Sequence, residues 1–291
     1  LDNTDIKDKI IKCIIKKSQY RTIIRTQEKS LNNKNDNIDF DIKETVDILN
    51  YSTNNKLIFN LKDQYLYILK SFDCRENRKS YDHEIQFYEK FGNAFHFIRK
   101  KYGQIDNGDV KRIILEYIEG ETLFKFIQNN KIELATKIKI ILEILLSVYF
   151  IHSNGFFLRD IKWDNIIINT SKDAILIDFD SSKNIKEQFT KENNIEQTHD
   201  IGVYIFTAPE QMRSNNYSYK VDSYSIGMII HYIITGIPYE MTYDYVNNIF
   251  ESGKNLLQSE KMPKCPKECN YLLRIYKNCF EIKPEKRPDI K

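Results

Sequence analysis

Residues 159–165 of the chain read RDIKWDN, and residues 178–180, which begin thirteen residues later, read DFD. Two short apolar runs separate these polar segments, III at residues 166–168 and ILI at residues 175–177. Paired runs of this kind predict a hairpin that brings the two polar segments together. Carboxylates, a lysine and an amide would then share one loop within an otherwise apolar stretch.

This set of side chains has the parts that phosphoryl transfer needs. Asp160 can accept or orient the proton of an incoming hydroxyl. Lys162 would neutralise charge on a transferred phosphoryl group. Asn165 and Asp178 offer the oxygen ligands that Mg²⁺ prefers. We therefore predict Asp160 and Lys162 as catalytic residues, and Asn165 and Asp178 as metal ligands.

Length and composition limit the alternatives. A chain of 291 residues with 41% hydrophobic residues can form one large domain or two lobes. The formal net charge is +3, which argues against a nucleic-acid-binding surface. The longest apolar runs, residues 138–151 and 225–237, are shorter than the ~20 residues that span a bilayer, so we expect buried core helices there. Nothing in the sequence specifies an oligomeric state.

The cysteines indicate a reducing environment. An odd number in a chain of this size argues against a disulfide framework, so we expect an intracellular, cytoplasmic protein. Cys265 and Cys269 lack a second pair of ligands, which favours ordinary thiols over a zinc site. The chain begins at Leu1 rather than at a methionine, so we expect a fragment or processed form whose native targeting segment lies outside it.

The chain divides into three parts by pattern. Residues 1–43 have isoleucines at helical spacing with lysines between them, then an Asn/Asp-rich stretch. They predict a basic helical extension, packed on the following domain or lying on a membrane surface, and a linker. Residues 44–118 are β-rich, with strands expected at 45–49, 56–61, 65–72 and 112–117 and a helix at 79–91. Residues 119–291 are mostly helical, so we predict an α+β fold with two unlike lobes.

These motifs resemble those of the eukaryotic protein kinase family, whose catalytic loop reads H-R-D-x-K-x-x-N and whose metal loop reads D-F-G. Residues 208–210 (APE) match its A-P-E motif, residues 221–227 (VDSYSIG) resemble its D-x-W-S-x-G helix, and residues 283–288 (KPEKRP) resemble its closing P-x-x-R-P. The resemblance covers residue 44 to the C-terminus. It implies a bilobal kinase fold, ATP with Mg²⁺ as cofactors, and a protein substrate.

The resemblance also implies structural and regulatory roles. Asp222 would tie down the backbone of the catalytic loop, and Arg287 would form a buried ion pair with Glu210. Phe179 would pack against Leu158, which replaces the family's histidine. Arg159 would bind a phosphate on the activation segment. The candidate phosphorylation sites are Ser181, Ser182, Thr190, Thr198 and Tyr204, with Thr190 and Thr198 preferred.

In the β-rich part, Lys70 ends an apolar strand and by resemblance would hold the α- and β-phosphates of ATP. Its partner would be Glu84, with Glu89 as the competitor; Glu84 is preferred because Tyr88 then points into the core one helical turn later. By resemblance, Leu115 would be the gatekeeper, and backbone groups of Glu116 and Ile118 would meet the adenine edge. Leu57, Ile68 and Ile167 complete the expected ATP-binding set.

The sequence departs from the family most where the glycine-rich loop should lie, since residues 50–57 contain no glycine. Asn50, Asn54 and Asn55 tolerate a left-handed backbone and could partly replace the glycines, while Ser52 and Thr53 could donate hydroxyl hydrogen bonds. The alternative is a β-turn that covers the nucleotide loosely. A loop without glycines vaguely resembles the FIKK group of kinases.

Further departures lie in and near the catalytic motifs. Ile68 stands where the family has a small alanine, and Trp163 replaces a proline as a packing or peptide-binding residue. Val203 replaces a threonine that is frequent in serine/threonine kinases. Asp180 replaces the glycine of D-F-G, where it could bind metal or raise the pKa of a neighbouring carboxyl group.

The leading interpretation is an active kinase that transfers the γ-phosphoryl group of ATP to a protein Ser/Thr hydroxyl. Lys162 is typical of that class. The alternative is a pseudokinase that acts as a binding or scaffold module, motivated by the glycine-free loop, Ile68 and Asp180. A small-molecule kinase of related fold is disfavoured because the A-P-E motif, Asp222 and Arg287 are all present.

Overall fold

The computed structural model describes residues 45–92, 96–185, 205–213, 217–237 and 278–290. Outside these residues lie the predicted extension and linker (1–43), Thr190, Thr198, Val203, Tyr204, and the Cys265–Cys269 pair. The chain forms two compact units: one holds the described residues up to Phe72 together with Lys101–Tyr117, and the other holds Asp73–Lys100 and the described residues from Ile118 onward. Residues 73–100 thus belong to the second compact unit, although the sequence placed them in the first lobe. The lobe boundaries at residues 44 and 118 stay a prediction.

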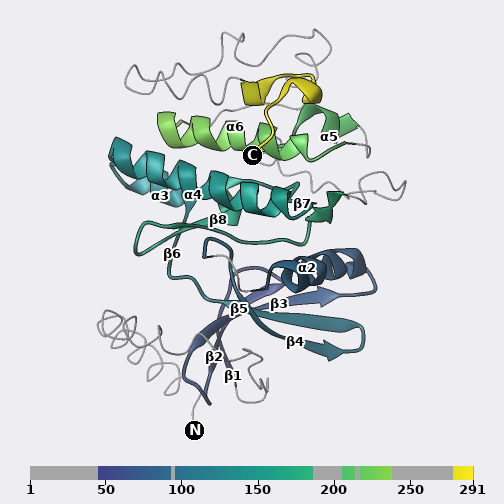
Figure 1. Ribbon diagram of the computed structural model, residues 1–291. Coiled ribbons are helices and arrows are strands. Elements are labelled where there is room, and N and C mark those ends of the chain that lie inside the picture. The colour runs from purple at the N-terminus through teal and green to yellow at the C-terminus, as the bar shows by residue number, and fades with distance from the viewer. Residues whose placement is uncertain (1–44, 93–95, 186–204, 214–216, 238–277, 291) are drawn as a thin grey trace. The chain divides into compact units, whose positions relative to one another are not determined.

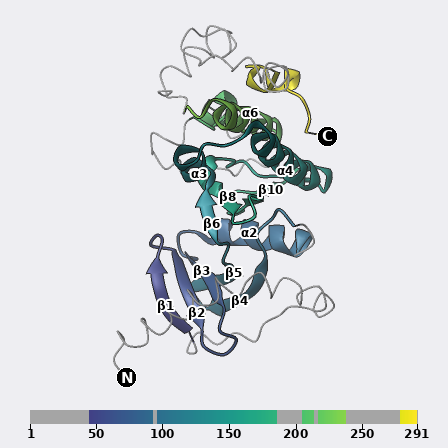
Figure 2. The same cartoon turned by 90° about the vertical axis from the view of Figure 1, so that its left-hand side faces the viewer.

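The first unit is a five-stranded sheet in the order β1-β2-β3-β5-β4, which can be followed in Figures 1 and 2. Its strands are β1 (Thr45–Asn50), β2 (Asn55–Asn60), β3 (Leu66–Asp73), β4 (Lys101–Asn107) and β5 (Val110–Glu116). A buried apolar cluster of Ile58, Tyr67, Leu69 and Ile114 holds the sheet together. Tyr67 and Leu69 share one face because side chains alternate along a strand.

The second unit is mostly helical, which together with the sheet confirms the predicted α+β class. Its helices are α2 (Arg78–Phe91), α3 (Leu123–Asn129), α4 (Leu134–Ser153), α5 (Pro209–Arg213) and α6 (Lys220–Thr235), with 3₁₀ turns η3 (Trp163–Asn165), η7 (Asn278–Phe280) and η8 (Pro284–Lys286). Helices α4 and α6 run side by side (Figure 1). Every residue of α6 from Val221 to Ile234 is buried, as predicted for an apolar core helix.

The prediction of a fully buried helix is wrong for α4. Leu142, Leu146 and Tyr149 lie on one face at helical spacing and are about half exposed. Only one face of α4 therefore packs into the core, and the other face is exposed to solvent. None of the helices in the described ranges is long and apolar enough to cross a membrane.

Short strands complete the second unit: β6 (Gly120–Thr122), β7 (Phe156–Phe157), β8 (Ile166–Asn169), β9 (Ala174–Leu176) and β10 (Lys183–Asn184). They form a β6-β8-β9 sheet and a β7-β10 pair. The antiparallel β8-β9 pair is the hairpin predicted from the two apolar runs. Gly120 lets β6 approach β8 closely, because a Cβ atom there would lie 2.2 Å from the carbonyl oxygen of Ile168.

Candidate active site

Asp222, a fully buried residue on α6, anchors the backbone of the catalytic loop. Asp222 Oδ2 accepts the backbone N–H of Leu158 at 2.7 Å, and Oδ1 accepts that of Arg159 at 2.8 Å. The ring Nε2 of His152, at the end of α4, lies 2.8 Å from Oδ2. These bonds supply the partners that a buried charge requires. The tie predicted between Asp222 and the loop backbone is present.

Asp160, Lys162 and Asn165 meet around one carboxylate oxygen. Lys162 Nζ lies 2.7 Å from Asp160 Oδ2, and Asn165 Nδ2 donates to the same oxygen at 2.9 Å. Asn165 Nδ2 also donates to the backbone carbonyl of Asp160 at 3.0 Å. The amide therefore fixes both the side chain and the main chain of Asp160.

The charge state of Lys162 is set by two opposing effects. Burial disfavours its ammonium form, but the charges of Asp160, Asp178 and Asp180 and the hydrogen bond to Asp160 outweigh burial, so the pKa of Lys162 is raised. Lys162 thus stays a cation at neutral pH. A fixed positive charge beside Asp160 is suited to the binding of a phosphoryl group.

The β8-β9 hairpin brings the two predicted metal ligands into the same pocket. The backbone N–H of Ile177 donates to the carbonyl of Asn165 at 3.0 Å. Asp160, Asn165, Asp178 and Phe179 then line one small pocket, with Leu158 among its other walls. This pocket brings Asp160, one of the two predicted catalytic residues, together with both predicted metal ligands.

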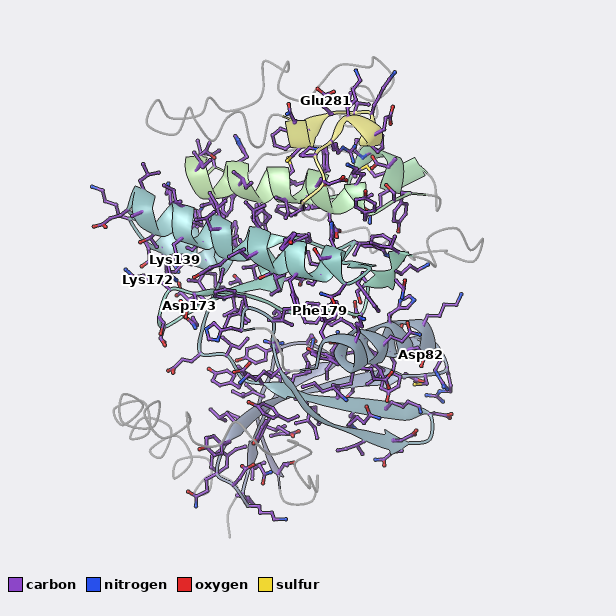
Figure 3. All side chains as sticks on the ribbon, viewed as in Figure 1. Asp82, Lys139, Lys172, Asp173, Phe179 and Glu281 are labelled. Atoms are coloured by element: carbon purple, nitrogen blue, oxygen red, sulfur yellow. The ribbon has the colours of Figure 1, made fainter. Side chains whose placement is uncertain are left out.

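The hairpin is held to α4 through the buried Glu143. Glu143 Oε2 accepts the backbone N–H of Ala174 at 2.8 Å, and Oε1 pairs with Lys139 at 2.7 Å. Lys139 Nζ also reaches Asp173 Oδ1 at 2.7 Å and the carbonyl of Lys172 at 2.8 Å, a group visible in Figure 3. These contacts fix the start of β9, and through β9 the segment that carries Asp178.

Three carboxylates converge at the metal loop. One carboxylate oxygen from each of Glu84, Asp178 and Asp180 lies within 4.8 Å of the others. Asp178 adopts a left-handed backbone, with φ of 68°. Asp180, which replaces the family's glycine, therefore stands among oxygen groups that a hard cation could bind.

The aromatic ring between these aspartates packs on α2. Phe179 is 1% exposed, and its ring stacks on Phe87 with centroids 4.0 Å apart and planes 10° apart. Tyr88 meets the same ring edge-on at 5.7 Å. His83, one turn earlier on α2, has its Nδ1 3.2 Å from the backbone carbonyl of Asp180. Helix α2 thus contacts the metal loop through apolar packing and one polar contact.

The predicted Glu210–Arg287 ion pair is present and is bidentate. Arg287 Nη1 lies 2.6 Å from Glu210 Oε1, and Nη2 lies 2.9 Å from Oε2. The Arg287 side chain is fully buried and the Glu210 side chain is 13% exposed. The pair joins the end of the activation segment to the last described residues.

Trp163 is a packing residue. Its ring contacts those of Phe124, Phe206 and Tyr232, with centroids 4.7 to 5.0 Å apart. This aromatic cluster joins α3, the catalytic loop, the segment before the A-P-E motif, and α6. The packing alternative for Trp163 is therefore supported.

The residues predicted to bind ATP fall in both units. In the sheet, Leu57 and Ile68 are buried cross-strand partners, Leu115 is buried on β5, and Glu116 is half-buried. The second unit contains Ile118, which is buried, and Ile167, which is half-buried on β8. Each of these residues is buried or half-buried, and their ATP-binding roles stay a prediction.

The lysine predicted to bind phosphate is buried on β3, with Lys70 Nζ 5.1 Å from the ring centroid of Phe72. On α2, Glu84 is fully buried whereas its competitor Glu89 is exposed. Burial thus favours Glu84 as the partner of a buried cation. Because Lys70 and Glu84 belong to different units, their pairing stays a prediction.

The turn between β1 and β2 closes on its own Ser52. Ser52 Oγ accepts the backbone N–H groups of Asn54 at 3.3 Å and of Asn55 at 3.1 Å, while Tyr51 and Ser52 donate theirs to the carbonyl of Asn55. Asn50, Asn54 and Asn55 are not among the described residues with positive φ. The idea that these asparagines replace glycine through a left-handed backbone is therefore wrong. The self-closed turn corresponds to the β-turn alternative.

Two neighbours of the site gave no signal in the sequence. His83 contacts the carbonyl of Asp180, and Gln211 Nε2 donates to the carbonyl of Arg159 at 3.0 Å. Both side chains contact backbone carbonyl oxygens. Every residue has such an oxygen, so the sequence does not indicate which one a side chain will contact. Arg159 itself has φ of 72°, and burial lowers the pKa of its guanidinium group.

Comparison with known proteins agrees with this geometry. The family described as protein kinase domain matches residues 50–291. A protein of Clostridium acetobutylicum named "Probable serine/threonine-protein kinase" is 31% identical over 188 residues, which are 62% of this chain and 27% of that protein. The serine/threonine-protein kinase STE20 of Eremothecium gossypii is 28% identical over 179 residues, which are 60% of this chain and 17% of that protein.

The chain thus spans less than a third of the length of these relatives. The family match nevertheless covers most of the chain and contains the anchored catalytic loop, the metal loop and the Glu210–Arg287 pair. The chain therefore belongs to the protein kinase domain family.

Proposed function

We propose that the chain is an active kinase domain that transfers the γ-phosphoryl group of ATP to a Ser or Thr hydroxyl of a protein. The observation that carries this proposal is the Asp160 carboxylate, which lies 2.7 Å from Lys162 Nζ and 2.9 Å from Asn165 Nδ2. Lys162 and the names of the relatives support the serine/threonine class.

In this reaction the substrate hydroxyl oxygen forms a bond to the γ-phosphorus, and the bond from that phosphorus to the bridging oxygen breaks. Asp160 orients the hydroxyl and accepts its proton, and ADP leaves with the electron pair. The raised pKa of Lys162 supports a lasting positive charge next to the phosphoryl group. Lys70 is the proposed ligand of the α- and β-phosphates.

Asn165 and Asp178 are the proposed ligands of Mg²⁺, which when bound would offset the charge of the phosphates. The donor set fits a hard cation. Asn165 turns its Nδ2 toward Asp160, so Oδ1 is the amide atom available to a metal. The Asp178 carboxylate lies beside two further carboxylates, those of Glu84 and Asp180.

The direct test is phosphate incorporation into a mixed protein substrate from labelled Mg-ATP. We expect activity in the 291-residue chain and loss of at least two orders of magnitude in Asp160→Asn, given the usual ~10²–10⁴-fold contribution of a general base. Asp109→Asn, at the exposed turn between β4 and β5 of the first unit, makes the same charge change and should keep full activity. Equal incorporation by Asp160→Asn and the unchanged chain would sink the proposal.

The second candidate is a pseudokinase, which the β1-β2 turn specifically favours. Backbone N–H groups of a phosphate-binding loop must be available to the phosphates. Four of them in this turn, at residues 51, 52, 54 and 55, already donate within the turn. A thermal-shift titration separates the candidates, because bound ligand must stabilise the fold. No shift at millimolar Mg-ATP would favour the pseudokinase.

A further inference from the structure

The side chain of Gln211 contacts the peptide group that precedes the catalytic aspartate. Gln211 follows Glu210 on α5 and is 52 residues from Arg159 in the chain. Its Nε2 donates to the Arg159 carbonyl at 3.0 Å. A carbonyl oxygen only accepts hydrogen bonds, so the NH₂ end of the amide must face it. That carbonyl belongs to the peptide joining Arg159 to Asp160.

The residue before this peptide is conformationally strained. Arg159 has φ of 72°, in the left-handed region that costs a non-glycine residue roughly 1 kcal/mol or more. A strained residue persists only where the surroundings hold it. The Arg159 N–H donates to Asp222 Oδ1 at 2.8 Å, and its C=O accepts from Gln211. Asp222 therefore holds one side of the strained residue, and Gln211 holds the other.

The two peptides that flank Asp160 are held in the same way. Asn165 Nδ2 donates to the carbonyl of Asp160 itself at 3.0 Å, on the downstream side. Gln211 provides the matching contact on the upstream side, to the carbonyl of Arg159. Without Gln211, the upstream peptide could rotate, and rotation of a peptide displaces the side chain that follows it. Displacement of about 1 Å can cost 10²-fold in rate.

We propose that Gln211 is a positioning residue for Asp160, which it serves by fixing the Arg159–Asp160 peptide. The effect on rate rests on the proposed function, since the position of Asp160 matters for turnover only if it acts as the base. The effect on backbone order does not depend on that function.

The test replaces Gln211 with Met, which has a similar length and no hydrogen-bond donor. We expect kcat to fall about tenfold, with the KM for ATP unchanged, because one hydrogen bond to the catalytic loop is lost and no contact to the nucleotide is altered. Amide hydrogen exchange should quicken in the peptide covering residues 157–162. The thermal midpoint should change little, because Gln211 is only partly buried.

The matched control is Asn130→Leu, which keeps the shape of the side chain and removes its hydrogen-bond donor. Asn130 Nδ2 also donates to a backbone carbonyl, that of Phe126 at 2.9 Å, at the end of α3. This variant loses the same kind of bond outside the catalytic loop, so kcat and exchange at residues 157–162 should stay at wild-type values.

The outcomes separate the two proposals. A kcat of Gln211→Met within twofold of wild type, or an equal loss in Asn130→Leu, would overturn the positioning role. If the unchanged chain transfers no phosphate, the proposed function fails instead. Hydrogen exchange then decides alone, and unchanged exchange at residues 157–162 in Gln211→Met would overturn the role of Gln211.

Discussion

Replacing Glu210 with Gln should destabilise the chain strongly, because it leaves the charge of Arg287 buried without its counter-charge. The Arg287 side chain is fully buried, and its guanidinium makes two bonds to Glu210, at 2.6 and 2.9 Å. Its other bonds go to the carbonyls of Glu281, Lys220 and Ile282, which are neutral. Breaking a buried pair typically costs 3–5 kcal/mol. The remaining carbonyl partners argue for the lower end, about 3 kcal/mol, which lowers the thermal midpoint by roughly 6–9 °C.

Thermal and urea unfolding followed by far-ultraviolet circular dichroism would measure this loss. Arg78→Gln is the control, since Arg78 Nε lies 3.2 Å from Asp82 Oδ1 in an exposed i,i+4 pair that should contribute only ~0.5 kcal/mol. The double variant Glu210→Gln/Arg287→Met should lose less stability than the sum of the single variants, because the partners are coupled. The reasoning is refuted if Glu210→Gln unfolds within 2 °C of wild type, on the order of the shift expected for the exposed pair.

Three further predictions concern packing, pH and the β1-β2 turn. Gly120→Ala should lower the urea midpoint by the equivalent of about 1–3 kcal/mol, because its Cβ would lie 2.2 Å from the Ile168 carbonyl oxygen; an unchanged midpoint would contradict the close approach. Burial lowers the pKa of His231 from 6.5 to about 4, so the unfolded chain binds the proton first and the free energy of unfolding should fall as pH drops from 6.5 to 4. This fall should be smaller in His231→Phe, and parallel pH profiles for both chains would exclude it. Ser52→Ala should release two backbone N–H groups and enlarge the thermal shift caused by Mg-ATP, whereas an equal shift would show that the turn does not contact phosphate.

Two kinds of feature could be predicted from the sequence: secondary structure that follows from local residue patterns, and pairs of oppositely charged buried residues. The β-rich runs predicted four strands of the sheet, β1, β2, β3 and β5, but gave no range for β4, and the two apolar runs predicted the β8-β9 hairpin. Asp222 and the Glu210–Arg287 pair were also predictable, since a buried charge needs a partner and the family motifs name it.

Contacts to backbone oxygens were not predictable in this way. Gln211 reaches a carbonyl 52 residues away, and His83 reaches one 97 residues away. Every residue has a backbone carbonyl, so the residue type at the accepting position does not reveal the contact. The prediction of left-handed asparagines in the β1-β2 turn was wrong because propensity alone does not fix a backbone conformation. The Ser52 hydroxyl accepts two backbone N–H groups and closes the turn without a left-handed residue.

The catalytic loop and the β1-β2 turn therefore differ in how their hydrogen-bonding groups are used. Asp160 is fixed through its side chain by Lys162 and Asn165, and through both flanking peptides by Gln211 and Asn165. In the β1-β2 turn, the proposed phosphate-binding loop, the backbone N–H groups of residues 51, 52, 54 and 55 already donate within the turn. Binding free energy that these groups do not contribute to phosphate is missing equally from the ground state and the transition state. Loss of such uniform binding raises KM and leaves kcat unchanged. We therefore expect this kinase domain to be limited by a high KM for ATP, with a kcat set by an intact catalytic loop.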